Sequence, residues 1–503
     1  KLRKDWKFDG VVISDWGAVH DTKMAAESGL DIEMDVKYQF HEQYMADPLL
    51  KAVRDGDIEE SMVDEKVRNI LRMMLRLKMI GPEKKNRKTG AYNTEEHRRA
   101  VLDVARESMI LLKNKDHVLP LCTESGCRVA VIGANAAAIH SNGGGSAEIK
   151  ALYEISPLMG IKKLLGGNVN VSYAPGYVIP DKEEASEINW QAASTENAGD
   201  TENECTVSGS TQGKQQKATA DAYHKKQKEA LEEAVALAKA SDIVIFVGGL
   251  NHDFDVEGLD RTDMKLPYGQ DAVIEALLKA APDMAVCMYA GSPVEMPWAE
   301  NAKAILWSYY AGMEGAETLF GKVNPSGKLS ETFIRDVSQC PAHTIGTFGK
   351  KDRVEYREGV MVGYRYYNTE KTDVLFPFGH GLSYTDFVYD DLKIAQQESE
   401  KQTVKVSCTV KNKGVREGKE TVQIYVAREQ EKNRIFQELK AFEKVELAAG
   451  EEKQICFTLD KQDFSHHDVQ KKMFLPVSGT YEIQVGASSA DIRLSKKINV
   501  IFE

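Results

Sequence analysis

Residues 8–17 read FDGVVISDWG, and this stretch decides the fold of the first part of the chain. Its apolar run ends in a polar turn, which is typical of a buried strand in a parallel sheet. A helix-like segment follows, and residues 29–34 (GLDIEM) indicate a second strand. Residues 48–80 carry apolar side chains every three to four positions, the pattern of a helix with one buried face. We therefore predict a strand–helix–strand–helix arrangement within residues 1–80.

The middle of the chain alternates between candidate strands and helices. A charged segment with glycine at both ends, residues 81–90 (GPEKKNRKTG), separates it from the opening. The expected strands are residues 129–133, 169–176, 242–249, 284–291 and 304–312, and the clearest helices are residues 227–240 and 270–281. This alternation predicts an α/β sandwich domain with a largely parallel sheet over residues 109–340, after a linker and helix over residues 81–108. Residues 183–219 are rich in polar residues and are expected to form an exposed excursion.

The C-terminal part changes to a period of two. Apolar side chains alternate with polar ones around Val406, Ile424, Phe457 and Ile483. Several such strands with turns between them indicate an antiparallel sandwich of immunoglobulin or fibronectin type. We place this domain at residues 389–503, after a linker over residues 341–388.

The bulk composition excludes two classes of protein. The formal net charge is -12 and the basic residues are scattered, whereas a nucleic-acid binder needs a basic face. No stretch approaches the roughly 20 apolar residues that a membrane span requires. We therefore expect neither a nucleic acid nor a membrane as partner. The hydrophobic content of 42% is that of an ordinary globular protein.

Asp15 is the first candidate for chemistry. It lies at the carboxyl end of the first expected strand, on the side where βα barrels carry their catalytic groups. The adjacent Trp16 offers a flat apolar surface suited to the face of a sugar ring. The alternative is that Asp15 only caps the following helix, and the local sequence does not decide between the two.

A second candidate is the acidic segment after the expected strand at 242–249. The charged residues within eleven positions are Asp253, Asp255, Glu257, Asp260, Arg261 and Asp263. Crowded carboxylates raise one another's pKa, and a carboxyl group that acts as a general acid must keep its proton near neutral pH. A calcium loop is a weaker interpretation, because Met264 stands where the bidentate Glu should be. Taken alone, the segment would be interpreted as a solvated acidic loop.

Residues 142–147 (NGGGSA) form the third candidate, because three glycines let backbone approach a ligand closely. A phosphate loop is the obvious rival, but no Gly-Lys-Ser/Thr follows and the strand at 129–133 lacks the dinucleotide pattern. The sequences at His41-Glu42 and His466-His467-Asp468 do not have the spacing of a metal site. Nucleotide and metal binding are therefore disfavoured.

Taken together, these pieces resemble glycoside hydrolase family 3 over essentially the whole chain. The strongest motif is FDGVVISDWGAVHD at residues 8–21, followed by GLDIEM, which is similar to the family's nucleophile segment at the seventh barrel strand and the strand after it. The further matches, in the family's order, are NGGGSA, VEGLDRTDMKLP (256–267), YYAGMEGAETLFGKVNPSGKL (309–329) and FPFGHGLSYTDF (376–387). The resemblance implies the last units of a (β/α)8 barrel, an α/β sandwich domain and a fibronectin type III-like domain.

The resemblance also implies roles for single residues in a two-step retaining mechanism. Asp15 matches the nucleophile and Glu257 matches the acid/base on the second domain, so a cleft between domains is implied. Retaining chemistry places two such carboxyl groups about 5–5.5 Å apart. Ser146 matches a residue near the sugar subsite, and Trp16 matches the aromatic at the pocket mouth. No metal and no organic cofactor is implied.

The implied activity is that of a β-glucosidase. Trp16 after the nucleophile and the presence of Glu257 are both glucosidase-like features within the family. The expected substrates are β-glucosides or short β-linked oligosaccharides, from which terminal non-reducing β-D-glucosyl residues are released. A β-xylosidase or another exo-β-glycosidase of the family is the alternative, because the residues that grip the sugar hydroxyls belong to earlier barrel strands.

One departure from the family concerns those strands. The family's barrel has eight strands, and this sequence begins just before the seventh. We therefore expect an N-terminal barrel portion of the same protein as a partner, and expect residues 1–503 by themselves to be inactive. A homo-oligomer is compatible with the sequence. No export signal is in view, and the location stays open between cytoplasm and periplasm.

Two rival classes of function remain to be weighed against a glycosidase. The chain could act as an inactive carbohydrate-binding or scaffold fragment, because the α/β and fibronectin-like domains fold without a barrel. A nucleotide-dependent α/β enzyme is disfavoured by the absence of phosphate-binding motifs.

Overall fold

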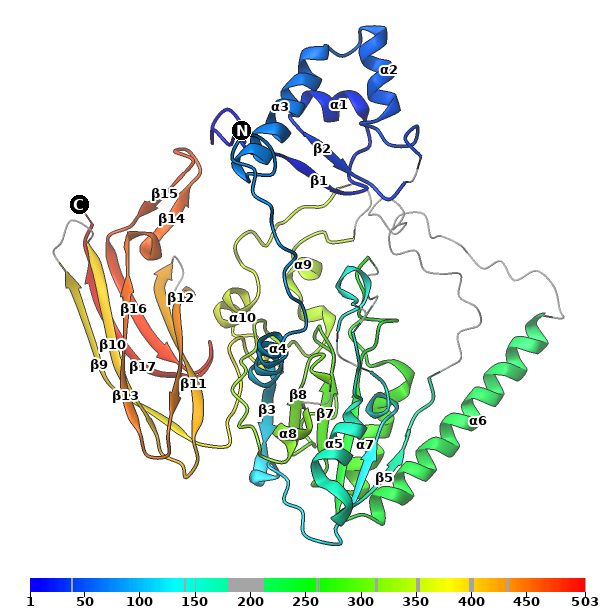
Figure 1. The fold of residues 1–503 in the computed structure, drawn as a ribbon. Helices are drawn as coiled ribbons and strands as arrows, with labels where there is room; N and C mark the ends of the chain where they lie inside the picture. Colours follow the sequence, from blue (N-terminus) through cyan, green and yellow to red (C-terminus); the bar gives the residue numbers. More distant parts are fainter. Residues whose placement is uncertain are drawn as a thin grey trace. The chain divides into compact units, whose positions relative to one another are not determined.

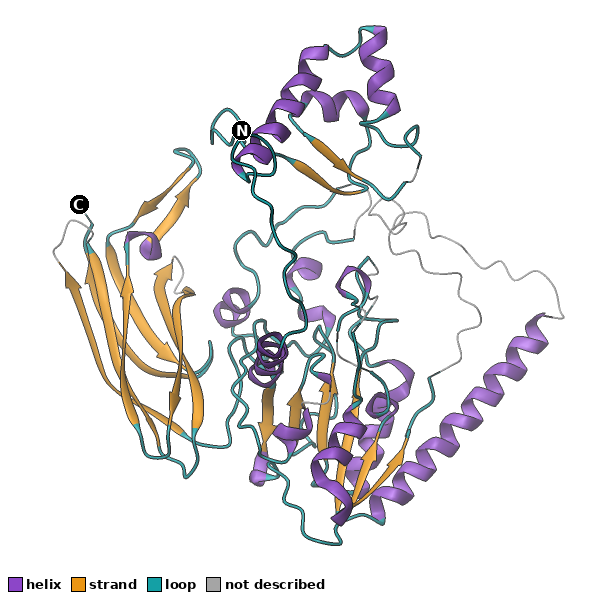
Figure 2. Ribbon diagram, viewed as in Figure 1, coloured by secondary structure: helices purple, strands orange, loops and turns teal. Residues whose placement is uncertain are grey.

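A computed structural model describes residues 1–37, 39–139, 142–149, 151–179, 212–258, 261, 263–312, 315–349, 353–397, 402–430 and 434–502 (Figure 1). The chain forms two compact units, one built mainly from Lys1–Thr94 and a larger one that holds most of the rest. The described residues contain helices and sheets in both units (Figure 2). No helix among them is long and apolar enough to cross a membrane.

The helices lie throughout the first 370 residues. They are α1 (Thr22–Glu27), α2 (Asp47–Asp55), α3 (Glu60–Arg76), α4 (Glu95–Ser108), α5 (Pro157–Leu165), α6 (Gln212–Lys239), α7 (Gln270–Ala280), α8 (Gly315–Leu319), α9 (Pro341–Thr344) and α10 (Tyr364–Glu370). The first eight strands are β1 (Ile13–Trp16), β2 (Ile32–Met34), β3 (Ile110–Asn114), β4 (Arg128–Ile132), β5 (Asn170–Ala174), β6 (Ile243–Gly249), β7 (Ala285–Tyr289) and β8 (Ala304–Trp307).

The remaining strands belong to the C-terminal domain. They are β9 (Phe387–Gln397), β10 (Thr403–Asn412), β11 (Gly418–Gln430), β12 (Arg434–Leu447), β13 (Glu452–Leu459), β14 (Ser465–Asp468), β15 (Met473–Pro476), β16 (Gly479–Gly486) and β17 (Ile492–Val500).

The first unit contains the expected strand–helix–strand–helix order. β1 and β2 pair in parallel, with Ile13 beside Ile32 and Trp16 beside Met34. The single helical stretch predicted for residues 48–80 is instead two helices, α2 and α3. Gly56 separates them because its φ of 82° is left-handed, a conformation that glycine adopts at helix ends without a steric penalty.

The apolar run before and within β1, although typical of a buried parallel strand, is not buried in this structure. The Ile13 side chain is 50% exposed, and Val11 and Val12 are only half-buried. Among the described residues β1 pairs with β2 alone. A parallel strand becomes buried only when neighbouring strands and helices cover both its edges and faces, and a single neighbour does not do so.

Polar side chains, more than apolar ones, tie α3 to this small sheet. The buried Asp31 carboxylate accepts hydrogen bonds from the Val12 backbone at 2.7 Å and the Asn69 amide at 2.9 Å, and it pairs with Arg3. The Lys66 ammonium donates to two backbone carbonyls before β2, at 2.6 and 2.7 Å, and burial lowers its pKa. The buried apolar cluster of this region is small, with Ala26, Leu49 and Ile58 as its buried members.

The second unit contains a six-stranded sheet in the order β3-β8-β7-β6-β4-β5. The five predicted strands correspond to β4 to β8, and their pairings with one another are all parallel. The edge strand β3 is antiparallel to β8 and was missed from the sequence. It follows α4 almost directly, and a short apolar run cannot be told from a buried helix segment by its periodicity alone.

Helices cover both faces of this sheet, which makes the α/β sandwich that the sequence predicts. Successive strand residues point to opposite faces, so Phe246 packs with α6 and α7 on one side while Ile245 and Val247 pack with α5 and α8 on the other. Residues 212–219, predicted as part of an exposed excursion, instead begin α6. The rest of that excursion, residues 183–211, lies outside the described residues.

The C-terminal domain is the predicted antiparallel sandwich. One sheet has the order β13-β10-β9 and the other β12-β11-β16-β17, with a separate hairpin of β14 and β15. Alternate residues of both sheets fill one apolar core, with Val406, Ile424, Phe457 and Ile483 among its buried members. The inward-facing positions are those predicted from the period of two.

A buried ion pair joins the two domains of the second unit. The Lys328 ammonium lies 3.2 Å from the Glu420 carboxylate on β11 and donates to the Gly381 carbonyl at 2.8 Å. The Tyr389 hydroxyl on β9 donates to the same carboxylate at 2.8 Å. Because Glu420 is only 4% exposed, these donors satisfy a charge that would otherwise be costly to bury.

Candidate active site

Asp15 lies at the carboxyl end of β1, as predicted. Its side chain is exposed, and its Oδ1 atom accepts a hydrogen bond from the Trp16 backbone at 2.7 Å. The helix-cap interpretation of Asp15 is wrong, because Asp21 caps α1 and accepts from the Met24 backbone at 2.6 Å. The Asp15 carboxylate is therefore not used to start the helix.

The turn after β1 presents Asp15 and Trp16 on a defined backbone. The Ser14 hydroxyl accepts from the Met34 backbone at 2.9 Å, and the Gly17 N–H donates to the Met34 carbonyl at 3.1 Å. Gly17 has a φ of 64°, which a residue with a side chain rarely adopts. The Trp16 ring is 53% exposed and can offer an apolar face to a ligand.

The acidic segment follows β6, and Asp255 anchors it. The Asp255 carboxylate accepts three hydrogen bonds: from the Gly291 backbone at 2.5 Å, the Ser292 hydroxyl at 3.1 Å and the Tyr310 hydroxyl at 2.8 Å. These donors follow β7 and β8, so the segment is held against the carboxyl ends of two neighbouring strands. Ligand sites in open α/β sheets lie at this edge.

Two further features support this anchor. Burial raises the pKa of the Tyr310 hydroxyl and the adjacent Asp255 carboxylate raises it further, so Tyr310 remains a donor over the whole working range of pH. A Cβ atom added at Gly291 would lie 2.7 Å from Asp255 Oδ2, so only glycine allows the carboxylate this close to the backbone. The anchored residue lies two positions before Glu257, which is itself exposed.

The glycine-rich segment packs against the acidic one. The His252 ring nitrogen Nε2 lies 2.9 Å from the Asn142 carbonyl. A Cβ atom at Gly144 would lie 2.9 Å from Val256 Cγ2, which explains a glycine at this position. The structure therefore brings the loop of Ser146, which lies exposed in the short 3-10 helix Gly145–Ala147, against the segment that leads into Glu257.

Two acidic side chains that the calcium interpretation would use as ligands contact other residues. Asp255 is engaged as described, and the Asp253 carboxylate accepts from the Tyr268 hydroxyl at 3.2 Å. Within the described ranges, no group of three or more His, Cys, Asp or Glu side chains is placed to hold a metal ion.

Sequence reasoning missed the residues that hold the acidic segment in place. Ser292 and Tyr310 follow two predicted strands, and His252 lies within the segment itself. The only signal was position, because polar residues after adjacent parallel strands meet at one edge of the sheet. The pairing of β7 and β8 was needed to show that both face Asp255.

The comparison with protein families covers most of the chain. Residues 109–384 match the glycosyl hydrolase family 3 C-terminal domain, residues 1–73 match the N-terminal domain of the same family, and residues 420–489 match a fibronectin type III-like domain. The fold and these matches define a glycosidase-type multidomain chain. It belongs to glycoside hydrolase family 3.

Individual relatives agree with this assignment. The chain is 38% identical to thermostable β-glucosidase B of Acetivibrio thermocellus over 99% of its length, and 32% identical to an exo-α-(1->6)-L-arabinopyranosidase of Bifidobacterium longum over 98%. It is similar to the crystal structure of DesR, a β-glucosidase from Streptomyces venezuelae in complex with D-glucose, with a TM-score of 0.82 at 26% identity. The chain spans 60% and 59% of the first two proteins and 73% of the third, with 99% of this chain covered in that last comparison.

Proposed function

We propose that this chain supplies the two catalytic carboxyl groups of a retaining β-glucosidase. The observation that carries the proposal is the pair of acids with distinct settings: Asp15 exposed at a parallel strand end beside Trp16, and Glu257 on a segment anchored at the edge of the sandwich sheet. Two carboxyl groups with different surroundings suit the two roles of nucleophile and acid/base.

Asp15 acts as the nucleophile in this proposal. Its carboxylate attacks the anomeric carbon, the bond to the leaving oxygen breaks, and a glycosyl-enzyme ester forms. The exposed Trp16 ring lies next in the chain, where its face can stack on the sugar. Water later attacks the same anomeric carbon, the bond from that carbon to the Asp15 carboxylate breaks, and the two inversions together retain the configuration.

Glu257 acts as the acid and then as the base. It protonates the leaving oxygen in the first step and removes a proton from water in the second. Asp255, held by three donors, fixes the backbone two residues earlier. In this proposal Ser146, on the glycine-rich loop packed against this segment, contacts the sugar.

The sugar at the cleaved position is proposed to be glucose. The names of the Acetivibrio and Streptomyces relatives support this choice. Another exo-glycosidase specificity is the second candidate, because a relative of 32% identity is described as an arabinopyranosidase. Rates on the p-nitrophenyl β-glucoside, β-xyloside and α-L-arabinopyranoside decide between them.

We further propose that additional barrel strands and helices cover Lys1–Thr94 in the working enzyme. The proposal rests on the apolar face of α3, where Val67, Leu71 and Leu75 are 46%, 45% and 49% exposed and line a recess of 530 Å³ with neighbouring Asp and Arg side chains. Apolar side chains in such numbers on one helix face are normally covered.

The role of Asp15 can be tested by trapping. The protein is produced both as residues 1–503 and within its complete coding sequence, and the active form is treated with a 2-fluoroglucoside. Peptide mass spectrometry should find the label on Asp15, and Asp15→Ala should abolish turnover. Asp21→Asn is the matched control, because Asn also caps helices and this variant should stay active. A label on any other peptide would refute the assignment.

The role of Glu257 can be tested by the leaving group. Glu257→Ala should slow substrates with poor leaving groups far more than activated aryl glucosides, because only the former need a proton. Azide should restore part of the turnover. Asp263→Ala, an exposed acid of the same segment, is the control and should change neither rate. If Glu257→Ala slows both substrate types equally and azide restores no turnover, the acid/base role would be assigned to Asp253, Asp255 or Asp260 instead.

A further inference from the structure

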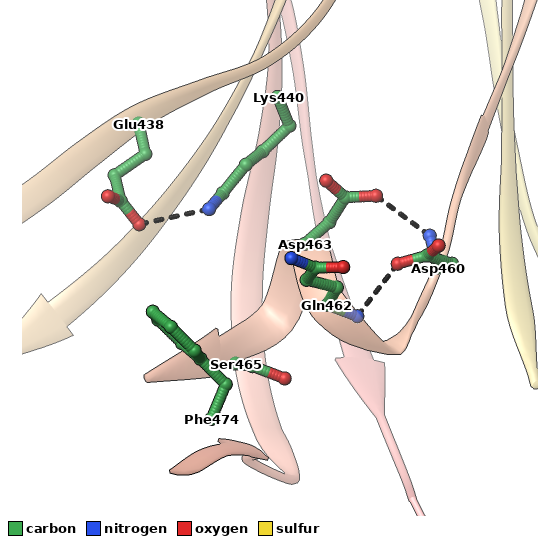
Figure 3. A pocket seen from close by; sticks show the side chains of 7 residues that line it. All are labelled: Glu438, Lys440, Asp460, Gln462, Asp463, Ser465 and Phe474. Atoms are coloured by element: carbon green, nitrogen blue, oxygen red, sulfur yellow. Dashed lines mark hydrogen bonds and ion pairs between the residues drawn. The ribbon is translucent and has the colours of Figure 1, made fainter. Parts of the chain in front are cut away.

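A recess of about 330 Å³ lies on the fibronectin type III-like domain, away from the acidic and glycine-rich segments in the sequence. Its lining residues are Glu438, Lys440, Asp460, Gln462, Asp463, Ser465 and Phe474 (Figure 3). They come from β12, the end of β13, the 3-10 helix Lys461–Phe464 and the β14–β15 hairpin. Small-molecule sites begin at about this volume.

An aromatic ring forms one wall of the recess. The Phe474 side chain is 60% exposed, which is unusual for a phenylalanine that serves only the core. His467 lies opposite it in the hairpin and meets the ring edge-on, with centroids 5.4 Å apart at 73°. The pairing of β14 with β15 also places Ser465 on the same face of the hairpin. His467 thus contacts the Phe474 ring, and Phe474 is among the residues that line the recess (Figure 3).

Hydrogen-bonding donors and acceptors line the same recess as this ring. The Lys440 ammonium pairs with Glu438 at 3.1 Å, which occupies only one of its three donors in that contact. The Asp463 carboxylate accepts from the Asp460 backbone at 2.8 Å, and Asp460 accepts from the Gln462 backbone at 2.7 Å. The side chain of Gln462 is exposed and adds an amide donor and acceptor.

The charges of the recess narrow the class of ligand. The lining contains three carboxylates, those of Glu438, Asp460 and Asp463, and one ammonium, that of Lys440. This excess of negative charge disfavours an anionic ligand. A metal ion is disfavoured as well, because no group of three His, Cys, Asp or Glu side chains is suitably placed in the described part of the chain. An aromatic face beside carboxylate, amide and ammonium groups suits a neutral ring with several hydroxyls, which is both donor and acceptor.

We propose that this recess is a carbohydrate-binding site for a neutral pyranose chain whose hydroxyls are equatorial, such as a β-linked glucan. The C–H groups on one face of such a sugar stack on Phe474. Its hydroxyls bond to Lys440, Gln462 and Asp463. The site does not depend on the catalytic roles of Asp15 and Glu257, and it would hold a polymer on the protein without cleaving it.

Affinity electrophoresis of the chain in gels that contain soluble mixed-linkage β-glucan tests the proposal. The unmodified chain and Asp15→Ala should be retarded equally, because binding at the recess needs no catalytic acid. Phe474→Ala should weaken the affinity about tenfold through the loss of ring contact, and Gln462→Ala should weaken it about threefold. Phe442→Ala is the matched control, since Phe442 is 66% exposed on β12 outside the recess and should leave retardation unchanged.

The remaining outcomes each contradict the proposal. Retardation that survives both Phe474→Ala and Gln462→Ala places sugar binding elsewhere on the chain. An equal loss in Phe442→Ala shows a general effect of exposed aromatic side chains. Stronger retardation by polygalacturonate than by β-glucan shows an anion site instead. Unchanged thermal unfolding of the variants is required, and Gln462→Ala keeps the test usable if Phe474→Ala does not fold.

Discussion

Two parallel strands with similar sequences reach different environments in this protein. Val11, Val12 and Ile13 lead into and open β1, where Ile13 is 50% exposed. Ile245, Phe246 and Val247 lie in β6, where each is at most 1% exposed. β6 has a strand on either side and helices on both faces, whereas β1 pairs with β2 alone in the described chain. The difference shows that an apolar run predicts a strand, while neighbours decide whether it is buried.

The first and largest consequence concerns local stability. Amides of β1 should exchange with solvent at least about a thousandfold faster than those of β6, because strand opening there exposes little additional apolar surface. Hydrogen exchange with peptide-level mass spectrometry on residues 11–17 and 243–249 measures this ratio. Trypsin should also cut in the exposed basic segment at 84–88 and leave a stable fragment that begins near Glu95. Equal protection of β1 and β6 from hydrogen exchange would contradict the difference in burial between the two strands.

The second consequence concerns one leucine from each region. Leu277 on α7 is fully buried under the six-stranded sheet, and Leu277→Ala should lower the free energy of unfolding by about 2–5 kcal/mol. Leu71 on α3 is 45% exposed, and Leu71→Ala should change it by no more than about 0.5 kcal/mol. Differential scanning calorimetry can follow the transition of each unit. A large decrease in the free energy of unfolding in Leu71→Ala would mean that the apolar face of α3 is covered in solution.

The third consequence concerns the segment that the packed sheet supports. Asp255→Asn replaces an oxygen that faces donors with an NH2 group, and it should displace the backbone before Glu257. We expect a loss of about 10–100-fold in kcat on substrates with poor leaving groups. The loss on activated aryl glucosides should be smaller, since these need no acid.

Removing the side-chain donors to Asp255 one at a time should give smaller losses of kcat on the same substrates. Tyr310→Phe and Ser292→Ala each remove one of the three hydrogen bonds and should reduce kcat less than Asp255→Asn does. Asp263→Asn is the control outside the anchor. A purely structural role for Asp255 would lower the thermal stability and slow both substrate types equally, which would contradict a positioning role.

The smallest consequence concerns carboxylates, whose pKa values shift in opposite directions in the two regions. Arg76 lowers the pKa of exposed Asp9 to about 2, whereas burial in the sandwich domain raises the pKa of Asp271 to about 6. The folded protein therefore holds a proton on Asp271 at pH values where the unfolded chain has lost it. This group makes the protein less stable as the pH rises from about 4 through 6.

Asp271→Asn should remove this dependence, because its amide oxygen can still accept the 2.8 Å hydrogen bond from Trp298 Nε1 without ionising. The rise in the pKa of Asp271 to about 6 corresponds to at most about 3 kcal/mol, and partial access of water reduces the expected gain in the free energy of unfolding at pH 7 to about 1 kcal/mol. Thermal unfolding at pH 4 and pH 7 measures the difference between variant and parent. A difference that is the same at both values would show that Asp271 does not titrate differently on folding.

The candidate site could be predicted in part. Asp15, Trp16, Ser146 and Glu257 were chosen from local motifs and from resemblance, and their roles remain predictions. The proposed domain boundaries also remain predictions. The anchor formed by Ser292 and Tyr310 could not be predicted, because it joins residues more than thirty positions from Asp255 along the chain. Such contacts depend on which strands become neighbours in the sheet, and the residues of a single strand do not determine that order.

The sequence by itself indicated the kind of most elements and the order of the fold types along the chain. The alternating strands and helices of residues 129–312 and the period of two after residue 389 reflect local backbone preference and amphipathic pattern, which act over a few residues. Only the tertiary structure decided that β3 joins the sheet at its edge and that Gly56 divides one helical stretch. These outcomes depend on hydrogen-bonding and packing partners that are distant in the sequence, because the neighbours of a residue in space determine whether it is buried.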